Sequence, residues 1–154
     1  MLKGSARAAL SATVAAAATG AVGLVGVVPA AAAGGRLAVV VDCRGNPVAL
    51  QPAVDSAAPG ATLLVTGTCT GPFTIGKDLS LIGLGAAVLD GNDAGSTVTV
   101  TGAVRVRLDK LTIANGAAGG ILNNGGTVTL TGSTVRDNRP NNCGGRVPVP
   151  GCGG

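Results

Sequence analysis

Few side chains in this 154-residue chain suit acid–base chemistry, because it contains seven Asp, no Glu and no His. His and Glu are frequent general acids and bases. Because the chain contains neither, Asp supplies all its side-chain carboxylates. One close acidic pair occurs, Asp90 and Asp93, in a glycine-flanked turn that also contains Asn92. As a calcium site it is weak, since two carboxylates and an amide fall short of the about six to eight oxygens that calcium takes. A solvated turn is the favoured interpretation.

A basic stripe is the second candidate site. Arg105 and Arg107 lie on the expected strand Val104–Leu108, and Asp109 and Lys110 follow in the step before the next strand. Guanidinium and ammonium groups in this arrangement suit a uronate-containing polymer, which they would hold through charge-assisted hydrogen bonds. The alternative, which we favour from sequence, is a charged exterior that keeps a β-sheet surface soluble and unpaired.

Four cysteines could form disulfides or bind a metal: Cys43, Cys69, Cys143 and Cys152. An even number in an exported chain predicts disulfides, with three connectivities possible. The economical connectivity joins Cys43 to Cys69 and Cys143 to Cys152, one disulfide at each end of the chain. Zinc is the competing interpretation, but the chain has no CxxC pair and no His.

The elements that position these residues repeat. Residues 97–116 and 119–138 form two copies, offset by 22 positions, that place Val106 over Val128, Leu108 over Leu130 and Asn115 over Asp137. A period in the low twenties, built from strands and turns without helix, predicts a β-solenoid in which each rung stacks on the next. We expect Asn115 and Asp137 to occupy rung corners, where Asn and Asp tolerate left-handed backbone.

Short strands are predicted throughout 61–138 from alternating apolar and polar residues between Gly, Asn and Asp turns. At about 22 residues per rung, this segment predicts three to four rungs. The expected strands are Thr62–Thr66, Pro72–Ile75, Leu79–Ile82, Ala87–Leu89, Thr97–Thr101, Val104–Leu108, Leu111–Ile113, Gly120–Leu122, Thr127–Thr131 and Ser133–Val135.

Both ends of the repeat carry capping sequences. Residues 34–60 predict a strand ending at Cys43 and then a short helix, beginning at Gln51 or a neighbour and stopped by Pro59-Gly60. Its apolar face, which includes Leu50 and Val54, would cover the open first rung. Residues 139–154 contain three Pro, five Gly and two Cys, and predict a disulfide-closed loop at the last rung.

Residues 1–33 predict a secretory signal peptide. A basic start (Lys3, Arg7) precedes an uncharged Ala/Val/Gly-rich run, and Ala31-x-Ala33 forms a small-residue cleavage site before Gly34. An uncleaved membrane anchor is the alternative, because the run is about long enough to span a bilayer. Without Lys3 and Arg7 the remaining chain has nine basic and seven acidic residues, a net charge of +2. A net charge this small does not indicate nucleic-acid binding. After cleavage of the signal peptide we expect no membrane partner.

Residues 46–138 resemble exported right-handed parallel β-helix proteins of the pectin lyase-like superfamily, particularly small bacterial members. The resemblance is carried by LTIANG at 111–116 and GGILNNGGTVTLTGSTVRDN at 119–138. It implies the fold but no single activity, because the superfamily holds lyases, hydrolases and adhesins. Its lyases use clustered acidic residues to hold Ca²⁺ and an Arg or Lys as base, and no such motif transfers residue by residue.

These observations predict an all-β protein: a short right-handed parallel β-helix with an N-terminal capping helix. The leading hypothesis is a secreted or cell-surface protein with a non-catalytic structural, adhesive or glycan-binding role and no required cofactor. A polysaccharide lyase or glycoside hydrolase with a reduced calcium-dependent site, and a truncated relic of a longer β-helix, are the alternatives. Stacking of free coil ends would give oligomers.

Overall fold

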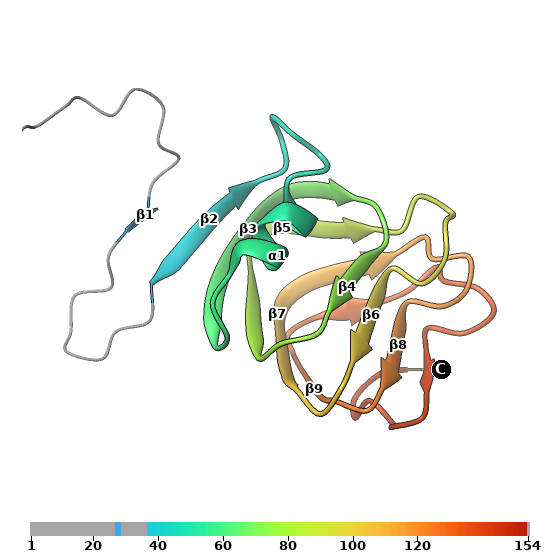
Figure 1. The fold of residues 1–154 in the computed structure, drawn as a ribbon. Helices are drawn as coiled ribbons and strands as arrows, with labels where there is room; N and C mark the ends of the chain where they lie inside the picture. The colour runs from blue at the N-terminus through green and yellow to red at the C-terminus, as the bar shows by residue number, and fades with distance from the viewer. Residues whose placement is uncertain (1–26, 29–36, 154) are drawn as a thin grey trace, which may run out of the picture.

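The structure, a computed structural model, describes residues 27–28 and 37–153. The predicted signal peptide therefore lies outside the described residues, apart from the two-residue strand β1 (Val27–Val28). The described chain is a parallel β-solenoid with one short helix, as the sequence predicts (Figure 1).

The larger of two sheets forms one side of the coil, and its strands from β2 onward pair in parallel. Strand β1 pairs antiparallel with β2 at one edge, whereas β9 and β10 both pair with β7 at the other. Its remaining strands are β2 (Ala38–Asp42), β3 (Ala61–Thr70), β5 (Leu79–Asp90), β7 (Arg105–Ala114), β9 (Thr127–Thr131) and β10 (Thr134–Val135).

The smaller sheet closes the other side of each rung. Its strands also pair in parallel, in the order β11-β8-β6-β4, and Figure 1 shows β4, β6 and β8 side by side. They are β4 (Phe73–Ile75), β6 (Val98–Thr101), β8 (Ile121–Asn124) and β11 (Cys143–Gly145).

The coil has about five turns, so the prediction of three to four rungs was too low. Two segments account for the difference. Strand β2, which precedes the predicted repeat, stacks on β3 from Ala38↔Thr62 to Asp42↔Thr66. In the tail, which was expected to be a loop, β11 continues the smaller sheet beside β8.

The offset of 22 residues is the register of β7 against β9 and β10 in the larger sheet. Strand β7 pairs with β9 at Val106↔Val128 and Leu108↔Leu130, and with β10 at Ile113↔Val135, which confirms the predicted alignment. The corner residues Asn115 and Asp137 adopt φ of 59° and 57°, the left-handed backbone expected of them.

The core runs along the coil as columns of equivalent inward side chains. One column stacks Leu63, Leu81 and Leu108 from successive rungs of the larger sheet, and all three are buried. Opposite, Phe73, Val98 and Ile121 form a column in the smaller sheet. Each such side chain contributes about 1.5–3 kcal/mol by burial, so stability depends on the next rung being present.

Helix α1 (Leu50–Ser56) caps the smaller sheet at its N-terminal edge, as predicted. It buries Leu50 and Val54. The side-chain amide of Gln51 pairs with the free edge of β4, accepting the Thr74 N–H at 2.9 Å and donating to the Thr74 carbonyl at 3.2 Å. The Lys77 ammonium donates to two carbonyls at the helix C-terminus, where a cation is favourable.

Two disulfides link Cys43 to Cys69 and Cys143 to Cys152, which confirms the economical connectivity. The second disulfide closes the tail over the last rung, where Val149 joins the core cluster. Leu130 in that rung is partly buried and packs against the core cluster. The tail therefore adds side chains to the core at the C-terminal end of the coil.

Candidate functional site

The predicted basic stripe lies on the outer face of the larger sheet. In β7 the side chains alternate, so Val106 and Leu108 point inward whereas Arg105 and Arg107 are exposed. Rung stacking brings outward residues from neighbouring strands beside them. Arg107 pairs with Ser80 of β5 on one side and with Thr129 of β9 on the other. We call Ser80, Arg105, Arg107, Thr127 and Thr129 the Arg/Thr face.

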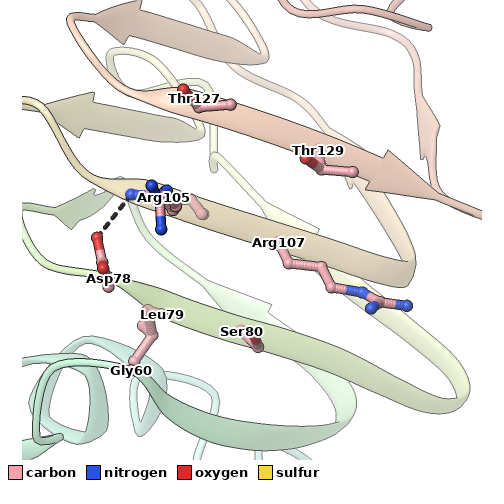
Figure 2. A pocket seen from close by; sticks show the side chains of 9 residues that line it. Gly60, Asp78, Leu79, Ser80, Arg105, Arg107, Thr127 and Thr129 are labelled. Carbon is pink, nitrogen blue, oxygen red and sulfur yellow. Dashed lines mark hydrogen bonds between the residues drawn. The ribbon is translucent and has the colours of Figure 1, made fainter.

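The Arg/Thr face lines a groove of about 220 Å³ across β5, β7 and β9 (Figure 2). At one end the Asp78 carboxylate accepts the backbone N–H of Arg105 at 2.7 Å. Because this bond uses the backbone, it positions the start of β7 and leaves the Arg105 guanidinium without a salt bridge to Asp78. Figure 2 shows Arg107 extending along β7, away from Arg105.

Arg107 is oriented by the carboxylate two residues further along its strand. Its Nη2 lies 3.1 Å from Oδ2 of Asp109, which is only 8% exposed. The other oxygen, Oδ1, is buried and has no hydrogen-bond partner in the part of the chain that the structure describes. The Arg107 side chain remains about half exposed, and a guanidinium has five N–H donors, so this pair leaves donor groups available to a ligand.

Lys110 lies outside the groove. It occupies the corner after Asp109 with φ of 54° and is exposed. Opposite this corner the pairing of β5 with β7 skips from Ile82 to Ala87, so β5 bulges there. The structure thus brings Arg105 and Arg107 together and places Lys110 beyond them.

Four polar groove residues were missed by the sequence reasoning: Asp78, Ser80, Thr127 and Thr129. A signal for the two threonines was present, because Thr127 and Thr129 lie 22 positions after Arg105 and Arg107. Asp78 and Ser80 lie 27 positions before the same arginines, and the bulge of β5 contributes to this longer offset. A constant offset therefore could not identify them.

The acidic turn lies at the opposite end of β5 from the groove. Asp90 uses one carboxylate oxygen to accept the Asn92 N–H at 2.8 Å and the other to accept the Asn115 side-chain amide at 2.9 Å. Asn92 and Asp93 both have φ of 52°, and the Asp93 N–H donates to the Asn115 carbonyl. These contacts describe a hydrogen-bonded rung corner.

No cluster of three or more Cys or Asp side chains suited to a metal ion occurs among the described residues. Over the same ranges, 27–28 and 37–153, no helix is long and apolar enough to cross a membrane. Comparison with protein-family models, with curated proteins and with solved structures found no match. The two disulfides indicate an oxidising, extracellular environment.

Proposed function

We propose that this protein is an exported, non-catalytic β-helix protein that binds an acidic polysaccharide on its Arg/Thr face. The observation that carries the proposal is the groove in which two exposed guanidinium groups lie among three hydroxyl side chains. This combination offers partners both for the carboxylates and for the hydroxyl groups of a uronate polymer.

The spacing of the two arginines suits an extended ligand. Alternate residues of one strand are about 7 Å apart, so Arg105 and Arg107 can each reach a different point along a chain molecule. A guanidinium holds a carboxylate through two parallel N–H···O bonds, a geometry that a lysine cannot reproduce. The hydroxyls of Ser80 and Thr129 flank Arg107, and each can donate or accept a hydrogen bond.

Export is part of the same proposal. It is supported by the expected signal peptide at 1–33 and by the two disulfides, which persist in oxidising compartments. The resemblance to the pectin lyase-like superfamily supports a polysaccharide as the ligand class. That resemblance rests on sequence motifs, so it supports the class of ligand but does not imply a catalytic activity.

A lyase or hydrolase is the competing proposal. It would need a base and an acidic group close together at the bound sugar. The acidic turn at Asp90 lies at the far end of β5. At the groove, the Asp78 carboxylate accepts the Arg105 backbone N–H and the Asp109 carboxylate pairs with Arg107. These contacts favour binding over turnover.

The test uses the chain 34–154 with a panel of polysaccharides, for example polygalacturonate and a neutral galactan, each with and without Ca²⁺. Binding is measured by calorimetry, and product is followed through unsaturated-sugar absorbance and reducing ends. We expect the acidic polymer to bind without product formation. Calcium-dependent product would instead support the enzyme, and equal binding of the neutral polymer would contradict recognition by arginine.

Substitution then assigns the binding to the groove. We expect Arg105→Ala with Arg107→Ala to weaken polygalacturonate binding by about tenfold or more, since each lost charge-assisted contact is worth about 1 kcal/mol at an exposed site. Arg136→Ala is the matched control, because Arg136 is similarly exposed but pairs with Asp137 outside the groove. An equal loss in the control would indicate nonspecific charge attraction.

A further inference from the structure

Strand β2 of the larger sheet has one edge that is largely open. Strand β2 pairs with β3 along its whole length, from Ala38↔Thr62 to Asp42↔Thr66. On its other side the described chain supplies only β1, which reaches Ala38 and Val39. An edge of this kind presents unpaired backbone groups to another strand.

The direction of the backbone groups identifies which residues are available. The Cys43 N–H donates to the Thr66 carbonyl, so it points toward β3. Because these groups alternate in direction along a strand, Val40 and Asp42 point their N–H and C=O groups to the outer edge. Neither residue has a partner strand on that side within the described ranges.

An apolar groove of about 380 Å³ adjoins this edge, between β2 and α1. Its lining includes Leu37, Val39, Ala53 and Leu63. Leu37 is 53% exposed and precedes β2 directly. Exposed apolar surface next to an open strand edge marks an interaction surface.

The two ends of the coil differ in a way that limits how copies can associate. At the C-terminal end Val149 joins the core, and the tail is closed by the disulfide between Cys143 and Cys152. Stacking of an N-terminal end on a C-terminal end would therefore have to accommodate this tail. Contact between two N-terminal ends is self-complementary and closes as a two-fold dimer.

We propose that a second copy of this chain docks at the N-terminal end, with the two β2 strands paired antiparallel about a two-fold axis. The antiparallel pairing of β1 with Ala38 and Val39 shows that this edge accepts a strand in that direction. Strand β1 lies within the predicted signal peptide, so its removal also frees the part of the edge at Ala38 and Val39 and leaves room for a longer strand. The inference rests on that removal and is independent of polysaccharide binding.

Sedimentation analysis over a range of concentrations tests the proposal on two chains. Residues 34–154 contain the whole core cluster, from Val39 to Cys152, so this chain keeps the folded unit. We expect it to dimerise, whereas a chain starting at residue 26 retains β1 and stays monomeric under the same conditions. A monomeric 34–154 chain would overturn the proposal, and so would equal dimerisation of both chains.

Two substitutions locate the interface. Leu37→Asp places a charge at the apolar groove, and Val40→Pro removes an outward N–H at an edge position where proline is tolerated. We expect each to raise the dimer dissociation constant at least tenfold in the 34–154 chain while the thermal midpoint of Leu37→Asp stays close to that of the parent. Leu84→Asp is the control, because Leu84 is 40% exposed and lies on β5. Unchanged dimerisation of Leu37→Asp, or equal weakening by Leu84→Asp, would refute the assignment.

Discussion

Replacing Asn138 by Asp tests the idea that buried side-chain hydrogen bonds join the rungs at their corners. The Asn138 Oδ1 accepts the Gly116 N–H at 2.8 Å and the Thr97 hydroxyl at 3.2 Å. Its Nδ2 faces three acceptors: the Ile113 and Arg136 carbonyls at 3.1 and 2.8 Å and the Asn142 Oδ1 at 3.2 Å. One side chain thus links four segments of the coil.

The substitution keeps the shape and reverses one half of the hydrogen bonding. The Oδ1 contacts of Asn138 survive, but the second carboxylate oxygen would face three acceptors. Loss of two donated bonds costs about 1–3 kcal/mol. Holding an ionised carboxylate against acceptors in a buried site adds a comparable amount, so we expect the free energy of unfolding to fall by about 3–5 kcal/mol.

Urea denaturation of the 34–154 chain at neutral pH measures this change. Asn124→Asp is the matched control, because Asn124 is exposed on β8 and undergoes the same change of charge. The carboxylate introduced at 138 is disfavoured in the fold, so its pKa lies above the unfolded value and the deficit shrinks as the pH falls toward that value. A decrease below about 1 kcal/mol, or one equal to the control, would refute the assigned network.

Two further predictions concern the N-terminal end. The backbone N–H of Arg44 and the Thr66 hydroxyl donate to Asp42 Oδ1 at 2.9 and 3.0 Å, and these bonds lower the pKa of Asp42. The ionised form of Asp42 therefore stabilises the fold above the unfolded pKa, and this contribution is lost as the pH falls through the folded pKa. Thr66→Val should raise the pKa of Asp42 in an NMR titration, and an unchanged pKa would contradict the assigned bond. Gln51→Ala removes both contacts to the edge of β4 and should destabilise by about 1 kcal/mol. Hydrogen exchange of the Thr74 amide should accelerate, and unchanged protection would show that Gln51 does not cap the edge.

The repeat register was predictable because it depends on local alternation. Inward Val and Leu recur at the same offset in β7 and β9, and a slip of one residue would turn every one of them outward. Helix α1 was predictable for a similar reason. Pro52 lies in its first turn and Pro59 follows its end, and the short apolar face between them has to be buried against the coil. In both cases neighbouring residues carry the information.

The turn count and the groove depend on contacts between distant segments. Strand β11 is Cys143-Gly144-Gly145, a sequence with little strand propensity, and it is held by pairing with β8 and by a disulfide. The groove brings Asp78 beside Arg105, although the bulge of β5 lies between them in the sequence and no local pattern predicts its size. Such features appear only when the rungs are stacked.

The proposal that the Arg/Thr face binds an acidic polysaccharide is tested most directly by mapping a bound oligogalacturonate on the 34–154 chain by NMR. The account predicts that the backbone amide shifts change most along β7 at Arg105 and Arg107 and at the paired residues Ser80, Thr127 and Thr129. Shifts centred instead on the Asp90 corner, or on β2 and α1, would contradict it.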